Sequence, residues 1–149
     1  LVLALDALAQ ASQELQTRFS PALGRRAAEL YHRMTGGRYH AVFLDHAFRA
    51  SAAESGEPIA RSADSLSQGA ADQLYLAVRL ALCELVLPAE VSIPLVLDDA
   101  LTSFDDTRCA AALELLLDLS RTRQILLFTC QHREAQFLAG RKGVCVHTL

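Results

Sequence analysis

The N-terminal part of the chain carries a regular apolar stripe. Its positions are spaced alternately four and three residues apart, with one polar member: Leu1, Leu5, Leu8, Ser12, Leu15 and Phe19. This is the a/d pattern of a heptad repeat, and it predicts a helix with one apolar seam. Spacing alone leaves two interpretations open, a coiled-coil arm and an ordinary amphipathic helix, because the stripe is short.

The same phase continues loosely to Met34, so the helix is expected to end at the Gly36-Gly37 pair. Ser20-Pro21 lies inside it and has the form of an N-cap followed by a first-turn proline. This pair predicts a kink or a fresh helix start.

Short apolar segments alternate with helical patterns in the rest of the chain. A strand that is apolar on both faces is predicted at 38–44, a hairpin partner at 48–52, a turn at 55–58 and a weaker strand at 59–61. The remaining elements expected are a helix after Ser67 to about Leu87, a buried strand at 93–97, a helix capped by Asp105 or Asp106, a buried strand at 124–130, a helix at 133–139 and a last strand at 144–147. This alternation predicts parallel βαβ units and the α/β fold class.

Composition narrows the class of protein. With 149 residues, 52% of them hydrophobic and 21% charged, the chain is suited to one domain and is not a disordered tail. No apolar run approaches the roughly 20 residues of a membrane helix. The net charge of −3 does not make this piece a basic nucleic-acid clamp on its own.

The four cysteines, at 83, 109, 130 and 145, form no C-x-x-C pair and do not point to a zinc site. Cys83, Cys109 and Cys130 lie in apolar stretches and are expected to be buried thiols of a reducing compartment. No basic, cleavable leader is present, so a cytoplasmic location is expected. The chain starts at Leu1 inside a running pattern, and we expect it to be a piece of a larger protein.

Three segments carry candidate chemistry. The apolar strand 95–97 ends in Asp98 and Asp99, where carboxylates can hold Mg²⁺ and orient a water. Ser67 and Gly69 open a helix, whose first turn offers free N–H groups to an anion. His132 follows a second apolar strand. Taken singly, each has an ordinary explanation: acids capping a turn, plain N-capping by serine, and a structural histidine.

In this order and spacing, the segments resemble the C-terminal lobe of an ABC-type ATPase head of the SMC-like and SbcC-like branch, most closely the bacterial YhaN-type proteins. The resemblance covers the chain from Pro21 onward. The matching segments are an arm-to-head junction at 35–39, a signature motif at 66–69, the run at 72–77 typical of this branch, a Walker B strand at 95–99, a D-loop at 103–105 and a switch histidine at His132.

The resemblance implies a P-loop NTPase-like parallel sheet covered by helices over residues 36–149, and a coiled-coil arm root with its junction helix over 1–35. It also implies ATP and Mg²⁺ as cofactors of the full-length protein. The implied roles are Mg²⁺ binding for Asp98, polarising of the attacking water for Asp99, γ-phosphate sensing for His132, contact with the partner head's nucleotide for Ser67, Gln68 and Gly69, and coupling of the two sites for Asp105.

Two features depart from the family pattern. No G-x-x-x-x-G-K-[ST] loop occurs in the chain, so this piece cannot form a complete ATP site and is expected to be inactive alone. Asp99 stands where many of these ATPases have a glutamate. The side chain is one methylene shorter, and this affects the expected hydrolysis rate more than nucleotide binding.

The partners that the resemblance implies are the protein's own N-terminal head lobe, which carries Walker A, and a second head in a homodimer. It also implies DNA contact through the full-length protein and an SbcD-like nuclease near the arm root, with residues 12–34 as candidates. The expected role is DNA repair or chromosome maintenance. The alternative is a non-catalytic, ABC-like scaffold with a helical arm. An ABC transporter subunit is a third possibility, which the arm-like N-terminus and the run at 72–77 disfavour.

Overall fold

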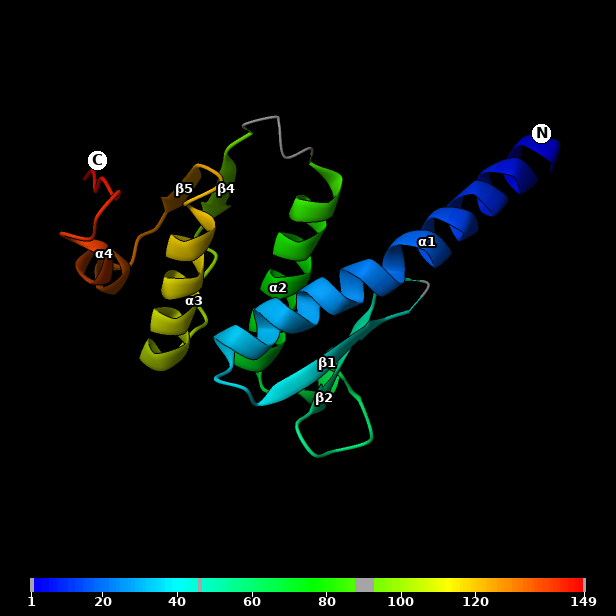
Figure 1. Ribbon diagram of the computed structural model, residues 1–149, viewed down its shortest axis with the longest axis horizontal. Coiled ribbons are helices and arrows are strands. Elements are labelled where there is room, and N and C mark those ends of the chain that lie inside the picture. Colours follow the sequence, from blue (N-terminus) through cyan, green and yellow to red (C-terminus); the bar gives the residue numbers. More distant parts are fainter. Residues whose placement is uncertain (1, 46, 88–92, 149) are drawn as a thin grey trace.

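Helix α1 (Val2–Met34) is the longest element of the computed structural model, which describes residues 2–45, 47–87 and 93–148. Its N-terminal half extends away from the other elements, and its C-terminal half lies against them (Figure 1). The helix is continuous through Pro21, so the fresh helix start expected there is wrong. Proline removes one backbone donor, and the packed turns that follow it are sufficient to keep the helix intact.

The apolar seam of α1 stays a prediction. Leu1 lies outside the described residues, as do the side chains of Leu5, Leu8, Ser12 and Leu15. In the C-terminal half, the side chains that enter the core are Leu23, Ala27, Leu30, Tyr31 and Met34. This half of α1 therefore packs as part of the lobe.

The Gly36-Gly37 pair ends α1 as expected. Both residues have positive φ angles, +61° and +89°. The Gly37 N–H donates to the His32 carbonyl at 2.9 Å, which closes the helix in the manner of a Schellman motif. The reversal directs the chain back along α1 into the first strand.

An antiparallel sheet lies beneath α1, in the order β1-β2-β3 (Figure 1). Its strands are β1 (Tyr39–Leu44), β2 (Ala50–Glu54) and β3 (Arg61–Ser62). The predicted hairpin and third strand are confirmed, with boundaries shifted by one to two residues. Small alanines on β2 let the sheet approach the helices closely.

Helix α2 (Gln68–Val86) follows the short 3₁₀ turn η1 (Ala63–Ser65) and packs against α1. Two buried hydrogen bonds join these helices: the Tyr31 hydroxyl donates to the Ala70 carbonyl, and Gln73 Nε2 donates to the Met34 carbonyl, both at 3.0 Å. The Tyr31 ring stacks on Tyr39, with 4.6 Å between centroids. The end of α1 is thereby fixed to the start of α2.

A parallel pair of strands forms the second sheet. Strand β4 (Leu95–Asp98) pairs with β5 (Ile125–Phe128), with Leu95 opposite Ile125 and Asp98 opposite Phe128. Helix α3 (Asp106–Leu119) connects them, and α4 (His132–Leu138) follows β5. The predicted parallel βαβ unit and α/β class are confirmed, and Asp105 is the N-cap of α3.

Three expectations for the second half are wrong. Strands β4 and β5 are half-buried on one face and open on the other, where Val96, Leu126 and Phe128 are exposed. Residues 144–147 form no strand, because no neighbouring strand among the described residues pairs with them. Cys130 is exposed and Cys83 is half-buried, and only Cys109 is a buried thiol. Cys130 lies just past β5, where the chain has left the core.

None of the helices in the described part of the chain is both long enough and apolar enough to cross a membrane.

Candidate functional site

The carboxyl ends of β4 and β5 bring the two predicted acidic residues to one edge. Asp98 is the last residue of β4 and is exposed, and Asp99 follows it. The Asp99 N–H donates to the Phe128 carbonyl at 2.9 Å, which extends the ladder by one bond. Parallel strands end at the same side of a sheet, and ligands of open α/β sheets bind there.

Asp99 is held in an unusual backbone conformation. Its φ is +44°, which is uncommon for a residue other than glycine and is tolerated best by Asn and Asp. The Thr102 hydroxyl donates to its carbonyl at 2.8 Å, and the Cys130 N–H donates to Asp99 Oδ1 at 3.0 Å. These two bonds use the Asp99 carbonyl and Oδ1 and do not involve Oδ2. Strained residues of this kind concentrate at functional sites.

His132 lies on the same side of the sheet. It is exposed and is the first residue of α4, and the turn that carries it is bonded to Asp99 through Cys130. Asp98, Asp99 and the turn before His132 therefore lie along one edge, as the sequence predicts. The roles of these residues stay predictions.

Ser67 begins the long helix α2 and is exposed. It has the extended backbone angles of an N-cap, yet its side chain makes no capping hydrogen bond. The hydroxyl is thus available beside a helix start whose first N–H groups have no partner within the helix. Gln68 is exposed too, and its amide donates to the Asp72 carboxylate at 3.0 Å.

Gly69 is buried, and the side chain of Arg108 lies over it. A Cβ built on Gly69 would be 2.5 Å from Arg108 Nη1 and 3.4 Å from Cζ. Asp105 holds this arginine: its Oδ2 is 3.2 Å from Nη1, and its Oδ1 accepts the Arg108 backbone N–H at 2.8 Å. Gly69 and Asp105 are therefore linked through one guanidinium.

Arg108 and Arg133 are residues that the sequence reasoning missed. Arg133 follows His132 directly, and its guanidinium donates to Asp106 Oδ1 at 3.0 Å and to the Leu101 carbonyl at 3.2 Å. The Asp106 carboxylate raises the pKa of Arg133. The sequence signal for Arg108 is its spacing. It follows the capping Asp105 by three residues, within one helical turn, and this spacing favours an ion pair between the two side chains.

The donors on these elements are carboxylate oxygens at the end of β4 and a hydroxyl at the start of α2. No cluster of three or more His, Cys, Asp or Glu side chains able to hold a metal occurs in the described residues. Two neighbouring carboxylates fit the preference of Mg²⁺ for oxygen ligands, with the remaining positions filled by water and phosphate. The free Ser67 hydroxyl at the start of α2 fits a phosphate.

Comparison with known proteins finds relatives of this chain in sequence and in fold. No family model matches the chain. The sequence is 35% identical over 111 residues to the uncharacterized protein YhaN of Bacillus subtilis (strain 168), a match that covers 74% of this chain. The chain spans only 11% of the length of that relative.

Solved structures with the same fold are heads of SMC ATPases. A chain from work on ATP-driven dimerization and DNA-stimulated activation of SMC ATPases gives a TM-score of 0.68 at 16% identity, covering 89% of this chain and 85% of that one. The Smc head domain of Pyrococcus furiosus bound to the C-terminal domain of ScpA gives 0.62 at 14% identity, covering 89% and 35%. The Smc head of Pyrococcus yayanosii gives 0.63 at 14% identity, covering 91% and 27%. The chain therefore has the fold of a C-terminal lobe of an SMC-like ATPase head and is similar in sequence to YhaN.

Proposed function

We propose that this chain is the C-terminal half of an ATP-dependent head that dimerises around nucleotide in a longer, SMC-like protein. The observation that carries the proposal is the edge formed by β4 and β5, where Asp98, the strained Asp99 and the turn before His132 are tied together by the Cys130–Asp99 bond. The free Ser67 hydroxyl at the start of α2 supports it.

In this proposal, Asp98 binds Mg²⁺ and Asp99 polarises the attacking water. Mg²⁺ neutralises charge on the transferred phosphoryl group when it is bound. His132 contacts the γ-phosphate from the edge of the sheet. Ser67 and Gly69, with Gln68, serve the nucleotide held by the second head, and Asp105 couples the two sites. The Walker A lysine comes from an N-terminal lobe outside this chain, so the isolated chain binds ATP weakly and does not turn it over.

The arm and the partners belong to the same proposal. Residues 1–35 form the root of a coiled-coil arm and its junction with the lobe at 36–149. Through the arm, the nucleotide state of the heads reaches DNA or a nuclease of the SbcD type bound near residues 12–34, in DNA repair or chromosome maintenance in the cytoplasm. Failure of the intact protein to co-purify with any nuclease would remove that partner.

The first test uses Ser67→Arg in the full-length protein. The large cation fills the helix start that the partner's nucleotide would approach, so ATP-dependent dimerisation is lost while ATP binding to Walker A is retained. Dimerisation is measured by analytical ultracentrifugation and binding by a fluorescent ATP analogue. Ser65→Arg, another exposed serine two residues away, is the matched control. Loss of nucleotide binding in Ser67→Arg would mean that Ser67 acts on its own head's site.

The second test uses Asp99→Asn. An asparagine still accepts the Cys130 N–H through its oxygen but lacks the charge that polarises water. The expected result is a fall in kcat of about 10²-fold or more, with ATP trapped in a stable dimer. Asp64→Asn, an exposed acid on η1, is the control. Unchanged turnover in Asp99→Asn would assign Asp99 to structure and would favour the non-catalytic scaffold.

A further inference from the structure

The contact between Arg108 and Gly69 joins two segments that are 39 positions apart in the chain. Gly69 lies in the first turn of α2, and Arg108 lies in the first turn of α3. Atoms Nη1, Cζ and Cδ of Arg108 all lie within 3.5 Å of the position that a Cβ on Gly69 would take. The arginine therefore lies along the glycine and fills the space above it.

Asp105 fixes the arginine in this place. One carboxylate oxygen accepts the Arg108 backbone N–H and the other pairs with its guanidinium, so one aspartate both caps α3 and holds the side chain. The arginine side chain is 29% exposed and the aspartate side chain 58%. A pair this open to water contributes little to stability, so its value lies in position.

A side chain at position 69 would therefore displace Arg108. A methyl group there would meet Nη1 at 2.5 Å and would push the guanidinium away from Gly69 and from Asp105. The usual explanation for a glycine in such a turn, room for a phosphate to approach the backbone, invokes a different molecule. In this chain, the guanidinium of Arg108 lies where a Cβ of Gly69 would stand, so this demand on Gly69 comes from within the chain and is separate from the proposed contact with the partner's nucleotide.

We propose that Arg108 is a positioning residue that holds the signature segment 66–69 against Asp105. The signature segment and the D-loop segment 103–105 then reach the partner head as one unit. The inference rests on the proposed function. In this inference, Gly69 leaves the space in which the Arg108 side chain lies. Head dimerisation then depends on the arginine as well as on the nucleotide.

The test is a double-mutant cycle in the full-length protein with Gly69→Ala, Arg108→Ala and the two combined. Arg108→Ala leaves the Asp105 cap intact, because that bond uses the backbone N–H. We expect a fall in kcat of about tenfold or more with KM for ATP nearly unchanged, because ATP binds first to the protein's own Walker A. Gly69→Ala has a similar effect. The double variant is no slower than the slower single variant, since the methyl group has no guanidinium left to displace.

Two further variants separate positioning from folding. Arg108→Lys keeps the charge that pairs with Asp105 and is expected to recover part of the lost kcat, whereas Arg108→Gln is not. Arg121→Ala is the control: it removes another arginine that pairs with an aspartate three residues earlier, at the far end of α3, and leaves kcat unchanged. Melting temperatures identify any variant that is misfolded.

The outcomes are distinguishable. A wild-type protein that forms no dimer with ATP contradicts the proposed function and this inference with it. If the wild type dimerises and hydrolyses ATP, unchanged kcat in Arg108→Ala overturns the inference alone. Effects of Gly69→Ala and Arg108→Ala that multiply in the double variant also overturn it, because they would show that Gly69 makes room for a phosphate independently of the arginine.

Discussion

Cys109 and Cys130 differ in their exposure to solvent. Cys109 is buried on α3 beside α4, and burial raises the pKa of its thiol, with the nearby Glu134 charge adding to the effect. Cys130 is exposed after β5. Because an accessible thiolate is the reactive species, the two cysteines are expected to differ in their rate of alkylation.

We predict that iodoacetamide at neutral pH modifies Cys130 and Cys145 in the native chain and leaves Cys109 unmodified until the chain unfolds. Peptide mapping by mass spectrometry at increasing reaction times measures this. The raised pKa means that the folded state favours the neutral Cys109 thiol. The contribution of this thiol to the free energy of unfolding is therefore complete below its pKa in the unfolded chain and is lost as the pH rises above that value. Rapid modification of Cys109 at the same rate as Cys145 would contradict the packing of α3 on α4.

Asp45 organises the turn between β1 and β2. Its carboxylate accepts the backbone N–H groups of Arg49 and Ala47 at 2.9 and 2.8 Å, and the Arg49 guanidinium at 2.8 Å. The hydrogen bond from the Arg49 backbone, with that from its side chain, lowers the pKa of Asp45. The charged carboxylate therefore stabilises the folded state.

The sign of the pH effect follows from this lowered pKa. The stabilisation by Asp45 is present above the ordinary aspartate pKa of about 4 and is lost as the pH falls through the lower, folded value. We predict that Asp45→Asn flattens the acidic part of the melting temperature against pH. Asp64→Asn, an exposed acid on η1, should leave that profile unchanged. Identical profiles for Asp45→Asn and wild type would show that the turn does not depend on the charge.

At the scale of elements, the joint between α1 and α2 depends on the Tyr31 hydroxyl. Burial raises the pKa of Tyr31, so the group stays a donor, and it bonds to the Ala70 carbonyl. Tyr31→Phe keeps the stacking on Tyr39 and removes only this bond. We predict a loss of about 1 kcal/mol in the free energy of unfolding, measured by urea denaturation. Tyr75→Phe, on the half-buried side of α2, is the control, and an equal loss there would argue against a special role for Tyr31.

The elements that the sequence predicts well have chemical end signals. Helix α2 starts after Ser67, α3 starts after Asp105, and α1 ends at two glycines in left-handed conformations. These signals are local, so they can be read without knowledge of the fold. Pro21 is also local, yet it misleads, because packing of the following turns against α2 outweighs one missing hydrogen bond.

In the candidate site, local sequence signals predict the placement of residues at strand ends but not the contacts that depend on packing. Asp98, Asp99 and His132 follow strands, and their placement at one edge follows from parallel pairing. The contact of Arg108 with Gly69 depends on how α3 packs beside α2, and no local pattern reports that packing. The left-handed φ of Asp99 likewise depends on bonds to Thr102 and Cys130 that come from two different loops.

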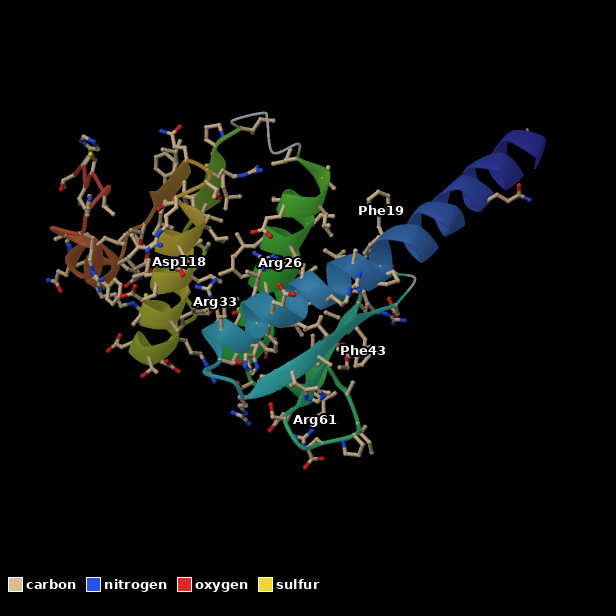
Figure 2. All side chains as sticks on the ribbon, in the orientation of Figure 1. Phe19, Arg26, Arg33, Phe43, Arg61 and Asp118 are labelled. Carbon is tan, nitrogen blue, oxygen red and sulfur yellow. The ribbon has the colours of Figure 1, made fainter. Side chains whose placement is uncertain are left out.

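Over the whole molecule, α1 holds the lobe together through charged side chains as well as the core. Arg26 Nε lies 2.5 Å from Glu84 Oε2 on α2, and Arg33 pairs with Asp118 on α3, where Figure 2 shows their side chains turned toward each other. These pairs border a cavity of about 390 Å³ between the three helices. Any rotation of α1 would have to break them, so they couple α1 to both α2 and α3.

The second sheet, formed by β4 and β5, is small and open on one face. It has two strands among the described residues, and one face of it is open: Val96, Leu126 and Phe128 are 58%, 39% and 49% exposed. A parallel pair of strands is normally covered on both faces, and isolated two-stranded sheets are marginal in water. In the head proposed above, the N-terminal lobe would cover this open apolar face.

We predict that the isolated chain self-associates through this face. Phe128→Lys places a charge on this face and is expected to weaken association by about tenfold or more, measured by sedimentation equilibrium over a range of concentrations. Phe43→Lys, at a phenylalanine on β1 that is 55% exposed, is the matched control and should leave association unchanged. Addition of the N-terminal lobe should suppress self-association of the wild type by covering the same residues. Self-association that survives Phe128→Lys but is lost in Phe43→Lys would place the open surface on the antiparallel sheet, and the second sheet would then be stable without a covering lobe.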